Sequence, residues 1–251
     1  MGMRLANKIA IITCGTGNLG SAQVQTFASE GAAVVIADID SVKGKQIERD
    51  TQKKLGNAIF TYLDVTNESS WIELVNKTVK IFGLPTILVQ NAGIYRSGKI
   101  LETDGAKWDS IMSVNAKGVF LGTKIVLPKM ISAGGGSIVN ISSTAGIIGS
   151  KISTAYNPSK AAVRVFTKST ALQHAKDNVR ANSIHPGPVE SDMLTEVYPE
   201  INLKRQRGLE IPLGRFARPI DVCNAALFLA SNESSYMTGS ELVIDGGLTA
   251  Q

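Results

Sequence analysis

Residues 8–20 read KIAIITCGTGNLG, in which an apolar run passes into a turn with three glycines. The run from Lys8 to Thr13 predicts a buried strand, and the residues from Leu19 to Ser29 predict a helix that ends at Gly31. A strand that enters a helix through a glycine-rich turn is typical of parallel α/β sheets. This stretch therefore predicts an α/β fold.

The same alternation of strands and helices continues along the chain. Further strands are predicted at 33–37, 58–63, 86–90, 137–141, 180–184 and 241–244, and further helices at 67–82, 108–131, 155–176 and 220–230. Short apolar strands separated by helices predict right-handed βαβ units and a sheet covered on both faces. With no linker, repeat or low-complexity run, residues 1–251 are predicted to form one Rossmann-fold domain, a doubly wound parallel sheet of about seven strands.

The composition is that of a globular protein with a sizeable core. Of the 251 residues, 43% are hydrophobic and 19% are charged. No apolar run reaches about 18 residues, the length that a membrane helix needs, and the N-terminal residues lack the apolar stretch of a secretory signal. A cytoplasmic protein is expected, with Cys14 and Cys223 as free thiols. No metal site is predicted, because neither these cysteines nor His174 and His185 have metal-ligand spacing; His185 is placed at a strand end, near the rim of a site.

The formal charge is +5, but Lys and Arg are scattered along the chain. The densest group is KRQR at 204–207, and neither a basic stripe nor a nucleic-acid-binding module is visible, so no nucleic-acid partner is predicted. This group reads as a solvated basic loop, with attraction of an anionic substrate as the alternative. It falls in 187–218, the least regular stretch, which is predicted to be a substrate lid.

The glycine turn also indicates a ligand. Gly15, Gly17 and Gly20 satisfy the G-x-G-x-x-G spacing between a predicted strand and a predicted helix, where backbone can approach a pyrophosphate. Asp38 ends the second predicted strand, where a carboxylate accepts hydrogen bonds from the adenosine ribose and repels a 2′-phosphate. NAD is therefore predicted over NADP. The alternatives are a plain βα turn and an Asp38 that only caps the next helix.

Tyr156 and Lys160 stand four residues apart, with Ser143 upstream. Helical spacing puts the tyrosine and the lysine on one face, where an ammonium is expected to lower the pKa of the phenol so that it acts as a base. In isolation each would be an ordinary helix or turn residue. Their occurrence together with the glycine turn favours an acid/base site.

With these residues in view, the chain resembles the short-chain dehydrogenase/reductase family over nearly its whole length. The glycine pattern of that family is T-G-x-x-x-G-x-G. Thr13 and Gly20 match it, whereas Cys14 and Asn18 replace glycines. Asn tolerates positive φ best among the non-glycine residues, so Asn18 is expected to keep the turn.

Other family positions match in order. The resemblance implies that Asp64 and Val65 contact adenine, that QNAG at 90–93 lies against the cofactor and steadies the sheet, and that the segment starting at Pro186 holds the nicotinamide amide. The implied cofactor-binding residues are Gly15, Gly17, Asn18, Leu19, Gly20, Asp38, Asp64, Val65, Asn91, Ala92, Gly93, Tyr156, Lys160, Pro186, Gly187, Val189 and Ser191.

The resemblance also implies the catalytic residues Asn115, Ser143, Tyr156 and Lys160. Tyr156 would be the general acid/base, with its phenolate favoured by Lys160 and by the positive nicotinamide ring. Ser143 would orient the substrate oxygen, Lys160 would also hold the nicotinamide ribose, and Asn115 would anchor a water that relays protons.

The implied reaction is hydride transfer between NAD(H) and a secondary alcohol or ketone. Largely apolar walls favour a small or medium, apolar or cyclic substrate. The predicted substrate-lining residues are Ile94, Tyr95, Ala145, Ile147, Ile152, Met193, Leu194 and Tyr198.

Three alternatives remain open. The first is a 3-oxoacyl-carrier-protein reductase, which Asp38 and the uncharged Pro128 and Leu172 oppose; the second is a sugar or polyol dehydrogenase. The third is a nucleotide-sensing or scaffold protein without activity, which the complete catalytic set opposes. The resemblance also implies a homodimer or homotetramer formed through two long helices and the C-terminal strand region.

Overall fold

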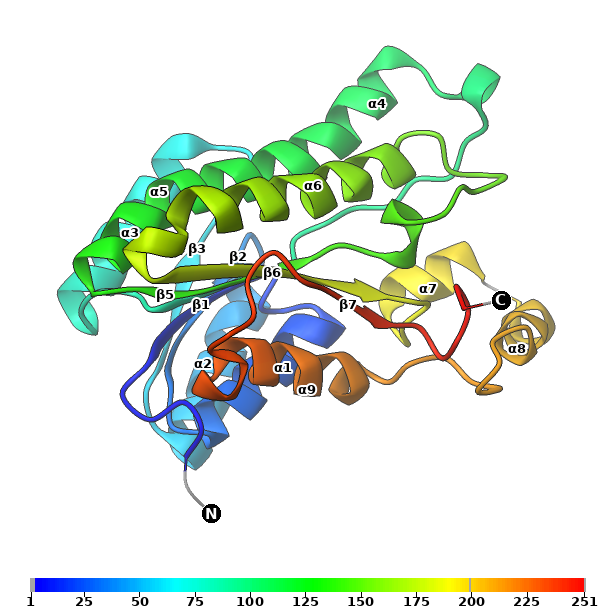
Figure 1. Cartoon of the computed structure of the whole chain (residues 1–251). Coiled ribbons are helices and arrows are strands. Elements are labelled where there is room, and N and C mark those ends of the chain that lie inside the picture. The colour runs from blue at the N-terminus through cyan, green and yellow to red at the C-terminus, as the bar shows by residue number, and fades with distance from the viewer. Residues whose placement is uncertain (1–2, 199, 251) are drawn as a thin grey trace.

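The computed structural model describes residues 3–198 and 200–250, and within them a seven-stranded parallel sheet forms the centre of the molecule (Figure 1). The sheet order is β3-β2-β1-β4-β5-β6-β7. The strands are β1 (Ile9–Thr13), β2 (Ala33–Asp38), β3 (Ala58–Tyr62), β4 (Ile87–Gln90), β5 (Gly136–Ile141), β6 (Val179–Pro186) and β7 (Glu241–Ile244). The predicted single α/β domain with about seven parallel strands is confirmed; residues 1, 2, 199 and 251 lie outside the described part.

Helices cover both faces of the sheet, as Figure 1 shows, with α3, α5 and α6 on one side and α1, α2 and α9 on the other. Apolar residues explain this arrangement, because each sheet face has its own buried cluster. Val24, Phe27 and Val222 belong to one cluster, and Trp71, Leu121 and Met130 belong to the other. The helices are α1 (Asn18–Ser29), α2 (Ser41–Leu55), α3 (Glu68–Ile81), α4 (Gly105–Met112), α5 (Gly118–Ser132), α6 (Tyr156–His174), α7 (Asp192–Val197), α8 (Ile201–Leu209) and α9 (Pro219–Ala230).

Three helical features depart from the ranges predicted from the sequence. Helix α2 is not among the helices predicted from the sequence, because it is strongly polar and buries only Gly44 and Thr51. The single helix predicted at 108–131 is α4 and α5 joined by a π-helical turn, Ser113–Lys117. The predicted irregular segment 187–218 contains α7 and α8. A small apolar cluster of Leu194, Ile211 and Phe216 lies inside that segment, apart from the main core.

The sheet order reverses between β1 and β4, which creates a crevice at the carboxyl ends of these strands. The predicted functional residues follow the strands at this same edge. Gly15 follows β1, Asp38 ends β2, Asn91 follows β4, Ser143 follows β5 and Gly187 follows β6. The fold therefore gathers residues that are far apart in sequence.

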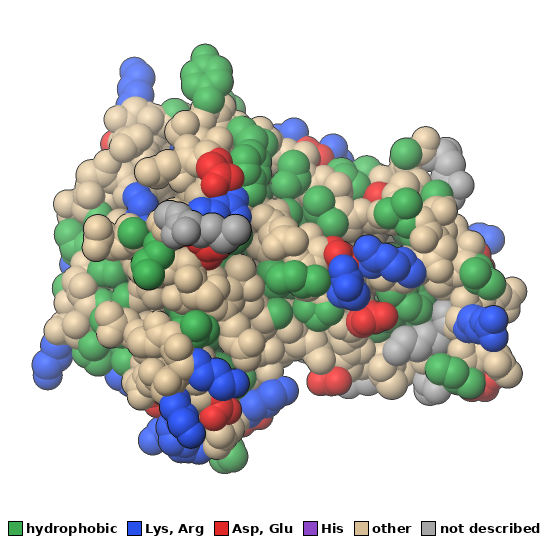
Figure 2. Space-filling view, turned by 90° about the horizontal axis from the view of Figure 1, so that it is seen from below, with side chains coloured by type: hydrophobic (Ala, Val, Ile, Leu, Met, Phe, Trp, Pro, Cys, Tyr) green, Lys and Arg blue, Asp and Glu red, His purple; other side chains and the backbone are tan. Residues whose placement is uncertain are grey.

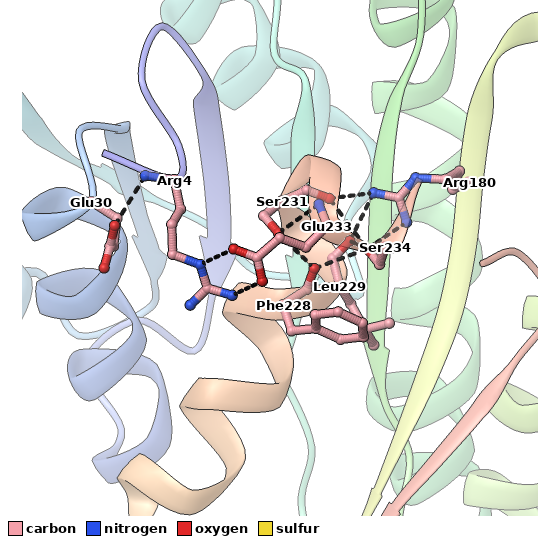
Figure 3. A network of polar contacts seen from close by, with 8 residues as sticks. All are labelled: Arg4, Glu30, Arg180, Phe228, Leu229, Ser231, Glu233 and Ser234. Carbon is pink, nitrogen blue, oxygen red and sulfur yellow. Dashed lines mark hydrogen bonds and ion pairs between the residues drawn. The ribbon is translucent and has the colours of Figure 1, made fainter. Parts of the chain in front are cut away.

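The opposite edge of the sheet holds a polar network that fastens the N-terminus (Figure 3). Arg4 donates from Nε and Nη2 to the two carboxylate oxygens of Glu233, at 2.7 and 2.6 Å. Arg180, on β6, donates from Nη2 to the carbonyl oxygens of Leu229 and Ser231 at 2.9 and 3.1 Å, where α9 ends. A guanidinium at a helix C-terminus neutralises the unpaired carbonyls, so this network supports the fold rather than the crevice.

On the face drawn in Figure 2, Lys and Arg side chains are interspersed with Asp and Glu and form no continuous stripe. Among the described residues, no helix is long and apolar enough to cross a membrane. The described part of the chain also holds no group of three or more His, Cys, Asp or Glu side chains placed to bind a metal ion.

Candidate active site

A cavity of about 850 Å³ opens at the carboxyl edge of the sheet. Its walls come from the glycine turn, the ends of β4, β5 and β6, the start of α6, and helices α7 and α8. Of the predicted catalytic residues, Ser143, Tyr156 and Lys160 line it. The predicted cofactor-binding residues that line it are Gly17, Asn18, Leu19, Gly20, Asn91, Gly93, Tyr156, Lys160, Pro186, Gly187, Val189 and Ser191.

The glycine turn is tightly packed, although Cys14 and Asn18 stand where the family pattern has glycine. A Cβ on Gly20 would lie 2.0 Å from the carbonyl oxygen of Cys14, so only glycine fits there. Cys14 takes the left-handed conformation, with φ 51°. Asn18 is the first residue of α1 and does not have a positive φ, so the expectation that Asn18 keeps the turn by adopting positive φ is wrong. The left-handed bend is needed at the first family glycine, so Cys14 carries the strain.

Asp38 is fixed against the glycine turn. Its Oδ2 accepts hydrogen bonds from the amide and the hydroxyl of Thr16, at 3.0 and 2.7 Å, and its Oδ1 accepts from the amide of Asp40 at 3.2 Å. The cap of α2 is Asp40, which accepts from the Lys43 amide at 2.9 Å. Asp38 is therefore not the cap of α2, and its carboxylate is held beside the turn.

Further polar contacts connect the turn to the centre of the sheet. Thr13 Oγ1 accepts from the amides of Asn91 and Ala92 at 3.0 and 3.2 Å. Gln90 donates from Nε2 to Thr123 Oγ1 on α5 at 3.0 Å and to Asn140 Oδ1 on β5 at 2.9 Å. Gln90 therefore links two strands and a helix beneath the cavity.

Asn115 lies behind the cavity wall, fully buried in the π-helical turn. Its Oδ1 accepts from the Ile94 amide at 2.8 Å, and its Nδ2 donates to the Ile94 carbonyl and to Ser159 Oγ, both at 3.0 Å. Ser159 in turn donates to the Tyr156 carbonyl at 2.7 Å. The extra residue of a π turn changes the direction of the side chains that follow, and here it connects Asn115 to the first turn of α6.

Tyr156 begins α6 and Lys160 follows one turn later, with Nζ 5.7 Å from the centroid of the phenol ring. The Lys160 ammonium donates to the Ile141 carbonyl at 2.9 Å. A Cβ on Gly93 would lie 3.3 Å from this nitrogen, so glycine there gives the lysine its room.

The pKa of Tyr156 differs in direction from the prediction. Burial raises it to about 12, although contact with the Ser143 hydroxyl lowers it. Burial also lowers the pKa of Lys160 to about 8. Both shifts have one cause, since a low-dielectric wall disfavours the charged form of each group. The prediction that Lys160 lowers the pKa of Tyr156 is therefore wrong for the protein without a bound cofactor.

Ser143 lies two residues after the end of β5 in extended conformation, and its Oγ accepts from the Ala145 amide at 3.1 Å. His185, predicted at the rim, is instead fully buried below it, with Nε2 2.8 Å from Ser183 Oγ and Nδ1 3.2 Å from the Ser143 carbonyl oxygen. His185 thus lies behind Ser143 and contacts its backbone. The position of His185 near the end of β6, the strand next to β5, was the sequence signal for this contact.

The substrate end of the cavity matches the predicted lining in part. Tyr95, Ala145, Ile152, Met193, Leu194 and Tyr198 line it, whereas Ile94 and Ile147 do not. The backbone of Ile94 is instead bonded to Asn115. The Tyr95 ring meets the Tyr156 ring edge-on, with centroids 5.1 Å apart. Ile148, Lys151, Ser153, Val197 and Arg207 also line it, and they fall within the segments predicted to form its walls, 144–155 and 189–215. Leu248 lines it as well and lies outside the predicted segments.

Five predicted cofactor-binding residues lie at the same edge of the sheet but do not line this cavity, namely Gly15, Asp38, Asp64, Val65 and Ala92. The Asp64 carboxylate accepts from the amide and the hydroxyl of Thr66, at 2.9 and 2.7 Å. Gly15 is packed against β2, since a Cβ there would lie 2.8 Å from Ile36 Cγ2.

Residues of the segment 187–218 line the cavity, and backbone hydrogen bonds join the two ends of the segment. The Glu190 amide donates to the Ala217 carbonyl at 2.9 Å, and the Ala217 amide donates to the Pro188 carbonyl at 3.0 Å. The Asp192 amide donates to Asn18 Oδ1 at 3.2 Å, which connects the start of α7 to the start of α1.

The chain's own geometry fits a dinucleotide. Gly17 precedes α1 without a side-chain cap, so the first amides of α1 are left for an anion. Gly17 and Gly20 both line the cavity, where the absence of Cβ atoms leaves the backbone exposed to it. A turn of this kind holds a pyrophosphate.

Comparison with known proteins agrees with this geometry. A family profile described as "Enoyl-(Acyl carrier protein) reductase" matches residues 16–249. The chain is 41% identical to the 2,5-dichloro-2,5-cyclohexadiene-1,4-diol dehydrogenase LinX of Sphingobium indicum, over 98% of each chain. It is 38% identical to the cyclopentanol dehydrogenase of Comamonas over 98% of this chain and 99% of the relative.

A third relative is the trans-4-hydroxycyclohexanecarboxylate dehydrogenase of Sinomonas cyclohexanicum, 41% identical over 98% of this chain and 95% of the relative. All three similarities extend over nearly the whole chain and include the glycine turn, Ser143, Tyr156 and Lys160 within their span. The chain belongs to the short-chain dehydrogenase/reductase family.

Proposed function

We propose that this enzyme is an NAD-dependent dehydrogenase that interconverts a secondary ring alcohol and its ketone. The observation that carries the proposal is one cavity lined by Ser143, Tyr156 and Lys160 next to an uncapped glycine turn. Dehydrogenases of this family use nicotinamide cofactors, so the same cavity accommodates both the cofactor and the alcohol.

In the direction of oxidation, Tyr156 takes the proton of the substrate hydroxyl, and Ser143 donates a hydrogen bond to the substrate oxygen and fixes its position. A bound NAD would supply the acceptor for the hydride of the carbinol carbon and a positive ring near the phenol. Lys160 would hold the ribose of the cofactor. Asn115, through Ser159 and the first turn of α6, keeps Tyr156 and Lys160 in place.

The pKa shifts support a site in which Tyr156 acts as an acid as well as a base. With its pKa raised to about 12 by burial, the phenol is protonated at neutral pH and is ready to protonate a ketone oxygen. Oxidation needs the phenolate, so it needs positive charge nearby. Because burial lowers the pKa of Lys160 to about 8, Lys160 supplies this charge at neutral pH and loses part of it at mildly alkaline pH.

The preference for NAD over NADP is proposed from Asp38. Its carboxylate is held at the end of β2 by Thr16 and accepts hydrogen bonds there, which suits ribose hydroxyls and disfavours a phosphate. Neither Thr16 nor Asp40 supplies a positive charge to offset it.

A ring alcohol is proposed because apolar and aromatic side chains form much of the outer cavity, among them Tyr95, Ile148, Ile152 and Tyr198. The names of the three relatives also describe dehydrogenases of ring alcohols. Segment 187–218 is proposed as the lid over this substrate, and its small apolar cluster supports a unit that can move as one body.

The test is a panel of cyclic, acyclic and polyol alcohols and 3-oxoacyl carrier-protein substrates, each with NAD(H) and NADP(H), followed by NADH absorbance. We expect NADH formation from cyclic secondary alcohols. Exclusive turnover of the carrier-protein substrate, or of polyols, would replace the proposal by that reductase or polyol reading. Stabilisation by NAD in a thermal-shift assay without turnover of any substrate, in either direction, would indicate a nucleotide sensor.

A cytoplasmic homo-oligomer is proposed as well. Exposed apolar side chains on α5 and α6 support it, with Phe120 46%, Val165 61% and Leu172 84% exposed. Phe120 also meets Phe166 edge-on, with ring centroids 6.3 Å apart, which joins the two helices into one apolar face. Light scattering on the purified protein should give the mass of a dimer or tetramer, and a monomer at micromolar concentration would refute this part.

A further inference from the structure

We propose that Arg207 forms a subsite for a carboxylate, so that the substrate is a secondary ring alcohol with a carboxylate away from the reacting hydroxyl. The inference rests on the proposed dehydrogenase function and extends it from the shape of the substrate to its charge. It adds a specificity-determining residue from α8 to a site whose reacting groups lie on β5 and α6.

Arg207 lines the same cavity as Ser143 and Tyr156. Val197 and Tyr198, from the same segment 187–218, line this cavity too. In Figure 1, α7 and α8 lie beyond the ends of β6 and β7. A guanidinium in a mostly apolar wall is costly unless acceptors reach it, so its position there requires an explanation.

The hydrogen bonds of Arg207 leave donors available. Its Nη1 forms an ion pair with Glu210, three residues later in the chain. Its Nε is buried and has no hydrogen-bond partner in the described part of the chain, and the side chain is 34% exposed. A guanidinium has five N–H donors in a planar fork that matches a carboxylate in a two-point contact. One ion pair with Glu210 does not satisfy that fork.

The charges around the cavity favour an anion. Its lining holds three cationic side chains, Lys151, Lys160 and Arg207, and one carboxylate, Asp192. Lys160 is buried and bonded to the Ile141 carbonyl. Lys151 is exposed and forms no ion pair with a described residue. Clefts with an excess of one charge raise the local concentration of the opposite charge, so an anionic alcohol is attracted before it binds.

The contrasting explanation is that Arg207 only fastens α8 through Glu210. The experiment compares three alcohols of one ring size: hydroxycyclohexanecarboxylate, the matching neutral hydroxycyclohexanecarboxamide, and cyclohexanol. The quantity measured is kcat/KM for each with NAD. The discriminating number is the ratio of the carboxylate to the carboxamide, because the two differ in charge and hardly in shape.

In the unaltered enzyme we expect the carboxylate to exceed the carboxamide by about 10- to 100-fold, the range of a charged hydrogen-bonded contact. Arg207→Met should bring the ratio close to one. Arg207→Lys should keep part of it, since the charge remains but the two-point fork is lost. Arg205→Met is the matched control: Arg205 lies on the same helix, is exposed and does not line the cavity, so the ratio should stay unchanged.

A ratio near one in the unaltered enzyme, or an unchanged ratio in Arg207→Met, would overturn the carboxylate subsite. Turnover of cyclohexanol in that case would leave the dehydrogenase function standing. Failure of all three alcohols and their ketones would refute the function itself and the subsite with it. If Arg207→Met does not fold, the comparison in the unaltered enzyme and in Arg207→Lys still decides the question.

Discussion

Replacement of Asp38 by serine should flatten or reverse the preference between NADH and NADPH. The carboxylate lies at the end of β2, beside the glycine turn, where Thr16 holds it through two hydrogen bonds of 3.0 and 2.7 Å. Serine keeps a small hydroxyl there but removes the charge. Two effects on the dissociation constants follow, and they have opposite signs for the two cofactors.

For NADH, the variant loses hydrogen bonds between ribose hydroxyls and a charged acceptor. A bond of this kind contributes about 1.5–3 kcal/mol, so the Kd for NADH should rise by about 10- to 100-fold. For NADPH, the variant loses repulsion between a carboxylate and a phosphate. Two unit charges about 4 Å apart repel by up to about 4 kcal/mol near a protein surface, less where solvent reaches them, so the Kd for NADPH should fall by about tenfold.

The same substitution has a structural cost that must be measured separately. Asp38 accepts hydrogen bonds from both Thr16 donors and from the Asp40 amide, and the loss of these contacts should lower the free energy of unfolding by about 1–3 kcal/mol. Asp40→Ser is the matched control. It removes a neighbouring carboxylate that caps α2 without touching the turn, and serine is itself a good cap.

The assay is a titration of NADH and NADPH followed by nicotinamide fluorescence, in the unaltered protein, Asp38→Ser and Asp40→Ser. The ratio of Kd for NADPH to Kd for NADH should fall by at least about 100-fold in Asp38→Ser only. Equal affinities in the unaltered protein, or an unchanged ratio in Asp38→Ser, would refute the role of Asp38. A change in thermal stability alone would show that the carboxylate only braces the turn.

Three further substitutions test the site and its support. Tyr156→Phe should lower kcat by at least about 100-fold while the Kd for NADH changes little, and retention of most of kcat would remove Tyr156 as the acid/base. Gly20→Ala places a Cβ 2.0 Å from the carbonyl oxygen of Cys14, so calorimetry should show NADH affinity reduced by at least about tenfold. Asp221 has its pKa lowered to about 2, chiefly by a hydrogen bond from Arg215. Its contribution to stability is therefore complete above about pH 4 and is lost as the pH falls toward 2; Asp221→Asn should lower Tm at neutral pH and have no effect near pH 2, and an effect independent of pH would contradict the assignment.

The sequence predicted the sheet well because its strands are short, apolar and bounded by turn residues. β7 has the predicted bounds, Glu241 to Ile244, and the other strands differ by at most two residues at either end. Helix α2 has no apolar stripe, so periodicity gave no signal for it. The Asp40 cap at its start was the available local signal.

The candidate site was predictable where it depends on spacing and unpredictable where it depends on long-range packing. The four-residue step from Tyr156 to Lys160 and the position of Ser143 at a strand end follow from local structure. The π turn that connects Asn115 to Ser159 has no sequence pattern of its own. The rise in the pKa of Tyr156 depends on how completely the surrounding chain buries the phenol, which spacing does not reveal.

The two departures from the family glycine pattern have different physical consequences. Cys14 adopts φ 51°, at a cost of about 1–2 kcal/mol for a residue with a Cβ. Its pKa is raised to about 11, mainly by burial, so its thiol is neutral at physiological pH and adds no charge to the turn. Asn18 instead gains a contact that glycine lacks, because its Oδ1 accepts the Asp192 amide at 3.2 Å and joins the turn to α7.

A phosphate-binding turn needs free backbone amides and a close approach of the backbone more than it needs any particular glycine. Here the amides come from the uncapped start of α1, and the close approach is preserved at Gly20, where no Cβ fits. Cys14 and Asn18 leave both requirements intact. The amino-acid differences at these two positions therefore exaggerate the structural difference from the family pattern. The contact from Asn18 connects the glycine turn to α7, in the segment proposed as the lid.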